Sequence, residues 1–457
     1  MQKLLLSANN LFKYFIAAII LAIPLYPKFP FIRIPGTYVS IRLEDLLMLI
    51  VGVFIAVKVL PRIKDFLNRK VERAMLIYLA VGAISLISAV LILHTVAFHI
   101  GILHWIRRVE YFLPFLAGAF LFRKKDENLL SFFVKLLGIV IIISFIYGFG
   151  QRYLGWPIII TQNEEYAKGI ALRWVPGSHV NGPFAGHYDL ATFMVMVLPI
   201  FVTLMVLVKK KTTKLILFML LLAGLWLLSE AISRISVVSY LLGTTLALFL
   251  VRKYKAIPFV LAISLIFFSL SGSLIMRYTR IIDVTKTRIQ QLQKKLFGYQ
   301  SKFIYAADAT VESRHGVYVP TPTPVPILED RSTSIRLNVE WPRAIRALVK
   351  NPLLGTGYSS ITLATDNDYL RLLGETGLLG FLAFALIFIR IGEIIIKSWP
   401  IRLEGVYEKA FVFGLLGSLP GIFLNALFID IFEASKFAIL FWLLIGFLVY
   451  MLKEPNG

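Results

Sequence analysis

The stretch YDLATFMVMVLPIFVTLMVLVKKK, residues 188–211, decides the class of fold. It is apolar almost throughout up to Val208, and three lysines follow directly. A bilayer core about 30 Å thick is crossed by roughly 20 apolar residues in a helix. Lys and Arg collect in the short loops on the cytoplasmic side of a membrane. The stretch therefore predicts a transmembrane helix whose C-terminal end lies at the cytoplasm.

The rest of the chain repeats this pattern. Of the 457 residues, 58% are hydrophobic and 16% are charged, and the mean hydropathy is +0.78. Soluble domains have about 45–50% apolar and about 25% charged residues. We predict an all-α polytopic membrane protein with about twelve transmembrane helices. The expected spans are 12–27, 44–60, 74–93, 105–122, 129–149, 188–208, 214–231, 235–251, 256–275, 370–389, 409–428 and 434–452.

A basic segment follows every even-numbered span. Because Lys and Arg concentrate in cytoplasmic loops, these segments predict the orientation of the spans. Examples are Arg123, Lys124 and Lys125 after span four, and Arg252, Lys253 and Lys255 after span eight. We therefore expect a multi-pass protein of the cell (inner) membrane with both termini in the cytoplasm. The predicted organisation is spans 1–9 within 1–275, with an outer loop at 150–187, a large extracytoplasmic loop at 276–369, and spans 10–12 within 370–457.

The large loop carries more Lys and Arg than Asp and Glu, although outer loops normally avoid positive charge. The simplest explanation is a polyanionic ligand. We expect an interfacial amphipathic helix in RYTRIIDVTKTRIQQLQKKLFGYQ (277–300) and a polyproline-like spacer in VPTPTPVP (319–326). A further helix is expected in PRAIRALVK (342–350), with Pro342 at its first position and Pro352 beyond its end.

The residue types that the chain lacks exclude several chemistries. It has no cysteine, which excludes thiolate catalysis and disulfides, and its six His are scattered without an HExxH pattern. We therefore expect no cofactor and no metal site, although a site built from carboxylates stays open as an alternative.

The most informative segments are RSTSIRLNVEWPRAIRALVKNPLLGTGYSS (331–360) and ATDNDYLRLLGETGLLGF (364–381). An Arg before a Trp-containing helix, then NPLLGTGY, an HN-x-YL element and E-x-GLLG resemble the signature of the O-antigen ligase and polymerase superfamily. Asp366 stands where that family usually has His. The segment SEAISRISVVSY (229–240) also resembles the family, through Ser233 and Arg234.

The resemblance implies a membrane glycosyltransferase that moves a glycan from a polyprenyl pyrophosphate carrier to a hydroxyl of a glycan, lipid or protein acceptor. The active site would lie outside the membrane and would use no metal. Guanidinium groups suit the departing pyrophosphate because they bind phosphate oxygens bidentately. The catalytic candidates are Arg234 and Arg336, with Asp366 as the base for the attacking hydroxyl. Asp368 could raise the pKa of Asp366.

Further polar residues are candidates for binding the donor or the acceptor. Four of them come from the outer segment before span six, and the other four come from the late loop and the motif that follows it. They are Arg173, His187, Tyr188, Asp189, Arg331, Asn367, Tyr369 and Glu375.

Simpler interpretations stay open for several candidates. Arg234 could extend to lipid headgroups, Asp366 could be the helix N-cap of span ten, and Glu375 could hold an Arg in place. GTG in LLGTGY predicts a tight turn that brings backbone amides close to a phosphate or to the next helix. A transporter or flippase of lipid-linked glycans is the alternative function, and a scaffold that binds an acidic polymer is a third. The sequence does not separate ligase from polymerase.

Overall fold

The computed structural model describes residues 2–27, 29, 31–33, 40–122, 126–158, 173–176, 178–269, 286, 334–361 and 364–452. The expected interfacial helix at 277–300, the spacer at 319–326 and the candidate Arg331 lie outside these residues.

A helix overlies each of the twelve predicted spans. The helices are α1 (Gln2–Leu25), α2 (Leu43–Val59), α4 (Lys70–Leu91), α5 (Phe98–Leu121), α6 (Glu127–Tyr153), α7 (His187–Leu207), α8 (Lys211–Glu230), α9 (Arg234–Leu250), α10 (Ala256–Ser269), α14 (Asp368–Lys397), α15 (Val406–Ala426) and α16 (Ser435–Leu452). Shorter elements are the 3₁₀ turn η1 (Leu60–Arg62), α3 (Ile63–Asn68), the π-helical turn η2 (Arg336–Glu340) and α13 (Trp341–Lys350). Two-residue strands β1 (Ile32–Arg33) and β2 (Ser40–Ile41) pair antiparallel, with Ile32 opposite Ile41.

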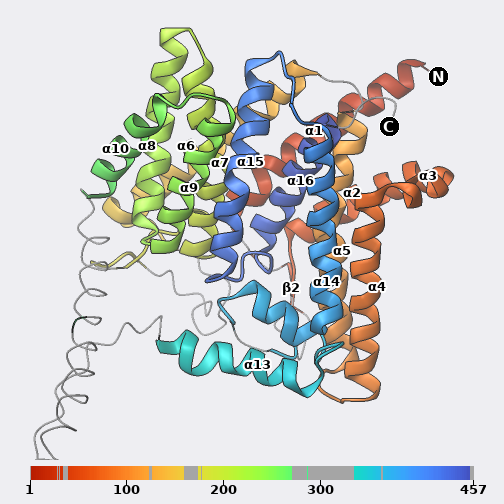
Figure 1. Ribbon diagram of the computed structural model, residues 1–457. Helices are drawn as coiled ribbons and strands as arrows, with labels where there is room; N and C mark the ends of the chain where they lie inside the picture. Colours follow the sequence, from red (N-terminus) through yellow and green to blue (C-terminus); the bar gives the residue numbers. More distant parts are fainter. Residues whose placement is uncertain are drawn as a thin grey trace, which may run out of the picture.

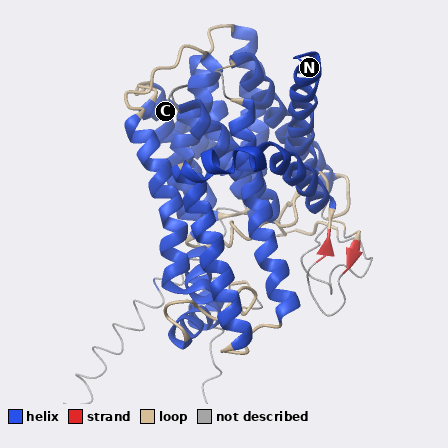
Figure 2. Ribbon diagram, turned by 90° about the vertical axis from the view of Figure 1, so that its right-hand side faces the viewer, coloured by secondary structure: helices blue, strands red, loops and turns tan. Residues whose placement is uncertain are grey.

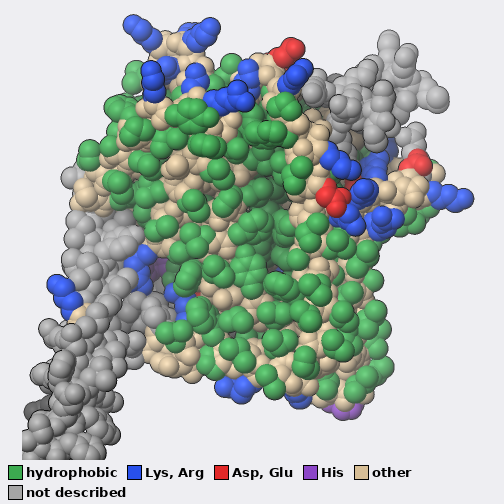
Figure 3. Space-filling view, in the orientation of Figure 1, with side chains coloured by type: hydrophobic (Ala, Val, Ile, Leu, Met, Phe, Trp, Pro, Cys, Tyr) green, Lys and Arg blue, Asp and Glu red, His purple; other side chains and the backbone are tan. Residues whose placement is uncertain are grey.

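Seven helices among the described residues are long and apolar enough to cross a membrane: α4, α6, α7, α8, α14, α15 and α16. Three shorter apolar helices are Leu11–Leu25, α9 and α10. Figure 3 shows hydrophobic side chains over most of the visible face, with Lys and Arg mainly at its upper edge and around α3. The protein is therefore a mostly helical, membrane-embedded chain, whereas the number of twelve spans and their sidedness remain predictions.

The helices form one bundle with α7, α15 and α16 near its centre. Helix α15 packs against α7 and α9, α16 packs against α5, and α14 packs against α4. Both chain termini lie toward one end of the bundle, and α13 lies across the opposite end (Figure 1). We call this opposite end the α13 end. Figure 2 shows that the β1–β2 pair lies at one side of the otherwise helical bundle.

Glycines let the central helices approach closely. A Cβ atom on Gly414 of α15 would lie 2.4 Å from the Cα of Ile200 in α7, and one on Gly421 would lie 2.4 Å from the carbonyl oxygen of Ser239 in α9. Small residues at such spacings are common where membrane helices pack tightly, because lipid provides no hydrophobic drive for helix association. The bundle centre is thus held by close backbone packing.

The structure confirms the helix expected at 342–350, with Pro342 in its first turn. It also corrects span ten, because α14 is interrupted at Gly377, where φ is +68° and ψ is −171°. Glycine adopts this backbone conformation without the steric cost that a Cβ would impose. The segment before Gly377 packs against α13, since a Cβ atom on Gly374 would lie 3.0 Å from the carbonyl oxygen of Ala344. The first turns of α14 therefore do not form one continuous helix with the segment after Gly377.

Candidate active site

Backbone hydrogen bonds join the NPLLGTGY loop to the part of α14 around its interruption at Gly377. The amides of Thr356 and Gly357 donate to the carbonyls of Gly374 and Glu375 at 2.9 and 2.8 Å, and the amide of Leu378 donates to the carbonyl of Pro352 at 2.8 Å. The φ of Gly355 is +67°, and its Cβ would lie 2.4 Å from the Glu375 carbonyl carbon. The predicted GTG turn therefore brings backbone amides to the next helix.

Asn367, rather than Asp366, caps α14. Its side chain accepts a hydrogen bond from the amide of Leu370 at 2.9 Å, which satisfies one of the free amides of the first turn. Asp366 precedes the cap with a φ of +49°, in the left-handed region that Asp tolerates better than most residues. The interpretation of Asp366 as the N-cap is therefore wrong, because its side chain has a different partner.

That partner is Arg336, from the π-helical turn. Arg336 donates to one Asp366 oxygen from Nε at 3.0 Å and from Nη2 at 2.8 Å, and it donates from Nη2 to the Tyr188 hydroxyl at 3.3 Å. Burial opposes the charge of Arg336, yet Tyr188 and Asp366 raise its pKa above the ordinary value. Burial raises the pKa of Asp366, and Arg336 opposes this rise. Three sequence candidates from three distant segments thus meet at one point.

Aromatic rings lie next to this site at the start of α7. The His187 ring lies 4.0 Å from the Tyr188 ring and stacks on His179 at 3.9 Å, with 14° between the latter two planes. The Arg336 guanidinium lies 6.0 Å from the centre of the Tyr188 ring, at the limit of a cation–π contact. His187 therefore belongs to the wall of the Arg336–Asp366 site.

Asp430, in the turn between α15 and α16, holds the backbone on both sides of Asp366. It accepts hydrogen bonds from the amides of Thr365 at 2.8 Å and Asn367 at 2.9 Å, and from the side chain of Arg371 at 2.9 Å. Asp430 also contributes to the raised pKa of Asp366. The expectation that Asp368 raises the pKa of Asp366 is wrong, because burial and Asp430 cause the rise. Asp368 instead accepts hydrogen bonds from the amides of Ile431 and Phe432.

A second charged group lies deeper, which we call the inner network: Arg108, Arg371, Glu375 and Glu433. Arg371 lies 3.5 Å from Glu375 and 3.7 Å from Glu433, and Glu433 also forms an ion pair with Arg108. Although burial opposes ionisation, Arg108 and Arg371 hold the pKa of Glu433 at about 2. Glu375 therefore holds an Arg in place, one of its predicted alternatives.

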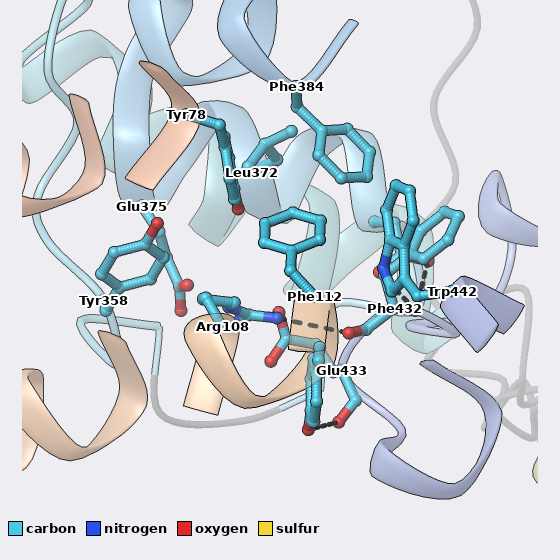
Figure 4. A pocket seen from close by; sticks show the side chains of 12 residues that line it. Tyr78, Arg108, Phe112, Tyr358, Leu372, Glu375, Phe384, Phe432, Glu433 and Trp442 are labelled. Carbon is cyan, nitrogen blue, oxygen red and sulfur yellow. Dashed lines mark hydrogen bonds and ion pairs between the residues drawn. The ribbon is translucent and has the colours of Figure 1, made fainter. Parts of the chain in front are cut away.

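A small cavity adjoins the inner network (Figure 4). Its volume is about 40 Å³, and Arg108, Glu375 and Glu433 share its wall with aromatic rings such as those of Tyr78 and Trp442. A polar cavity of at least 10–15 Å³ can hold a water molecule. This space is thus too small for a sugar and suits bound water among buried charges.

Four other candidates lie on α7, α9, α14 and the segment before α7. Arg234 is the half-buried first residue of α9, Arg173 is exposed, and Asp189 is buried in the first turn of α7. Tyr369 donates its hydroxyl to the Phe423 carbonyl at 3.0 Å and so fastens α14 to α15. The described contacts do not assign Arg234 a catalytic role, which stays a prediction.

The residues expected from the sequence do not include Asp430, Glu433 and Arg371. The signal was present: IDIFEASK (429–436) places two acids in a short turn between two apolar helices, where an unpaired charge would be costly. Among the described residues, no group of three or more His, Asp or Glu is arranged to hold a metal ion.

The fold and the site define a helical membrane protein with a charged site at the α13 end of its bundle. Residues 217–385 match the family model described as O-Antigen ligase, so this part of the chain is similar to the O-antigen ligase family. The matched range runs from α8 into α14 and includes Arg234, Arg336 and Asp366. The match indicates a glycosyltransferase-type enzyme of the ligase or polymerase kind. No curated protein matches the chain.

Proposed function

We propose that the protein transfers an oligo- or polysaccharide from a polyprenyl pyrophosphate carrier to an acceptor hydroxyl, at the extracytoplasmic face of the cell membrane. The observation that carries the proposal is the Arg336–Asp366 pair, held between η2 and the start of α14 inside the matched family domain. The donor would be a lipid-linked glycan, and the acceptor a glycan, lipid or protein hydroxyl.

Arg336 is suited to the leaving group of this reaction. A departing lipid pyrophosphate develops negative charge, and a guanidinium stays ionised and binds phosphate oxygens through a planar fork. Asp366 and Tyr188 fix the orientation of Arg336 before any donor arrives. This preorganisation supports catalysis because the Arg336 guanidinium does not have to be ordered during the reaction.

The aromatic wall of the site suits a sugar. Tyr188, His187 and Trp341 present rings at the α13 end, with Trp341 lying 6.3 Å from Phe428 of the α15–α16 turn. Aromatic rings offer an apolar body with a polar tip, which matches the mixed surface of a glycan. Ligase and polymerase activity would share this donor site and differ in the acceptor.

The test is reconstitution of the purified protein in liposomes with lipid-linked glycan from its source cells. Released polyprenyl pyrophosphate and glycan length are followed by mass spectrometry. We expect release and a new glycosidic product. Arg336→Ala should lower the rate about 10²–10³-fold, the loss typical of one transition-state donor. The control is Arg346→Ala, an exposed arginine of α13.

Two outcomes would contradict the proposal. Movement of intact glycan lipid across the bilayer without release of the carrier would indicate a flippase. Binding with neither release nor movement would indicate a scaffold. The mass of the product would separate ligation from polymerisation.

A further inference from the structure

The base at this site must accept a proton from the attacking hydroxyl, and Asp366 is poorly placed for that task. Its Oδ2 accepts both hydrogen bonds from Arg336. Protonation of Asp366 would remove the charge that orients Arg336, at the moment when Arg336 must bind the leaving group. A second carboxylate, free of such a partner, would avoid this conflict.

Glu340 is such a carboxylate. It closes the π-helical turn that Arg336 opens, and the amide of Trp341 donates to the carbonyl of Arg336 across the turn. The turn therefore keeps Glu340 and Arg336 within one helical repeat of each other. π-helical turns are rare and frequently occur at functional sites, and this one joins the Arg336–Asp366 pair to α13.

Three polar atoms near this turn are buried without a hydrogen-bond partner in the described part of the chain. They are Oε2 of Glu340, Nε1 of Trp341 and Nη1 of Arg343. A buried polar group without a partner is costly, so such atoms are uncommon in folded proteins. One acceptor and two donors within four residues match the hydroxyl groups of a sugar, which donate and accept.

Charges around Glu340 give it the basicity that the task requires. Burial, followed by repulsion from Asp366 and Asp430, raises its pKa to about 7, against attraction from Arg336 and Arg343. A general base works best when its pKa lies near the operating pH. Glu340 would be ionised in an appreciable fraction of molecules at neutral pH and would still bind a proton readily.

We propose that Glu340, rather than Asp366, accepts the proton of the attacking hydroxyl, and that Trp341 and Arg343 hold the acceptor sugar. This inference rests on the proposed glycosyltransferase activity. The acceptor oxygen forms a bond to the anomeric carbon, and the bond from that carbon to the pyrophosphate oxygen breaks. The pyrophosphate leaves with the bonding electrons, and the hydroxyl proton moves to Glu340. Asp366 is then a positioning residue for Arg336.

The first measurement is the pH dependence of kcat for carrier release by the wild-type protein in liposomes, from pH 5.5 to 8.5. Because the base must be ionised, kcat should rise about tenfold per pH unit below pH 7 and level off above it. Glu340→Gln should lower kcat about 10²–10⁴-fold and abolish this rise. Glu340→Asp should keep part of the activity together with the rise.

Two variants serve as comparisons. Asn338→Ala changes an exposed residue of the same turn that bonds only Ser334 among the described side chains, and it should leave kcat unchanged. Asp366→Asn should lower kcat but keep the increase of kcat with pH below pH 7, because Glu340 is still present as the base. Donor binding, measured by tryptophan fluorescence, should be similar in Glu340→Gln and the wild type.

The outcomes separate this inference from the proposed function. If the wild type releases no carrier, the proposed function fails. If it releases carrier with a kcat that is flat over the pH range, or if Glu340→Gln stays within threefold of wild type, only the role of Glu340 fails. The wild-type profile decides even if Glu340→Gln does not fold. If Asp366→Asn were the only variant to lose the increase of kcat with pH below pH 7, Asp366 rather than Glu340 would be the base.

Discussion

The Arg336–Asp366 pair and the inner network are two charged groups built in opposite ways. In the pair, one arginine faces one carboxylate, and the two side chains are 11% and 23% exposed. In the inner network, Arg371 is shared among Glu375, Asp430 and Glu433, and its side chain is 14% exposed. Opposite charges shared in this way compensate each other inside the protein. Among the described residues, buried polar atoms without a hydrogen-bond partner occur at both places: Nε of Arg371 and Oε1 of Glu375 in the inner network, and Oε2 of Glu340 beside the pair.

Asp430 connects the two groups, since it bonds Arg371 on one side and the amides that flank Asp366 on the other. We therefore expect the inner network to determine stability, the pair to determine turnover, and Asp430 to affect both.

The largest effect on stability is expected for Glu433→Gln. The change leaves Arg108 and Arg371 without their shared carboxylate, and removal of one partner of a buried pair typically costs about 3–5 kcal/mol. Because the Glu433 side chain is 26% exposed, we expect about 3 kcal/mol. The measurement is the free energy of unfolding by SDS in mixed micelles, with exposed Glu404→Gln as the control. Equal unfolding of both variants would contradict the stabilising role.

The pH dependence of stability sharpens this prediction. Because the pKa of Glu433 is lowered to about 2 in the folded protein, its contribution is present above the ordinary pKa of about 4.3 and is lost as the pH falls toward 2. The difference in unfolding free energy between wild type and Glu433→Gln should thus be constant from pH 8 to pH 5 and should shrink below that. A difference that changes between pH 8 and pH 6 would point to another titrating group.

An intermediate effect is expected for Asp430→Asn. Loss of the charge weakens hydrogen bonds to Arg371 and to two amides, and hydrogen bonds with charged groups are worth about 1.5–3 kcal/mol. We expect about 2 kcal/mol of destabilisation. Because Thr365 and Asn367 flank Asp366, carrier release should also fall, by between about 10-fold and 100-fold. Asp65→Asn on exposed α3 is the matched control. Lower stability with unchanged turnover would show that Asp430 does not support the function of the Arg336–Asp366 pair.

The smallest effect is expected for Asn367→Ala, which removes the N-cap of α14. Loss of such a cap costs about 1 kcal/mol. Turnover per folded molecule should change by less than about threefold, because Arg336 and Asp366 keep their contact. Asn367→Ser, which can still cap the helix, should restore the unfolding free energy. A large loss of turnover in Asn367→Ala would instead indicate a direct role of Asn367 in binding.

Much of the architecture could be predicted from the sequence. Helix positions were predicted because an apolar run must be helical to satisfy its backbone in lipid, and each predicted run contains a helix. Helix α13 was predicted because Pro342 and Pro352 mark its limits. The family motif identified Arg336 and Asp366 as candidates, and the family match includes both.

The partners of these residues were decided by the tertiary structure. Asp366 lies in the segment before α14, yet its partner Arg336 and its neighbour Asp430 come from distant parts of the chain. No local sequence pattern predicts these long-range contacts. Helix periodicity predicts which face of a helix is apolar but not which other helix packs against that face. For the same reason the sequence leaves a helix cap open as an alternative role for Asp366, although Asn367 fills that position.

The sequence by itself thus determined a helical membrane protein with a basic, motif-bearing late loop, because composition and periodicity act along the chain. Only the tertiary structure decided that α14 is interrupted at Gly377 and that Asp366 is engaged by Arg336. It also decided that one oxygen of the half-buried Glu340 is enclosed without a hydrogen-bond partner among the described residues. Burial and pairing depend on which segments pack together, and that packing is a property of the assembled bundle.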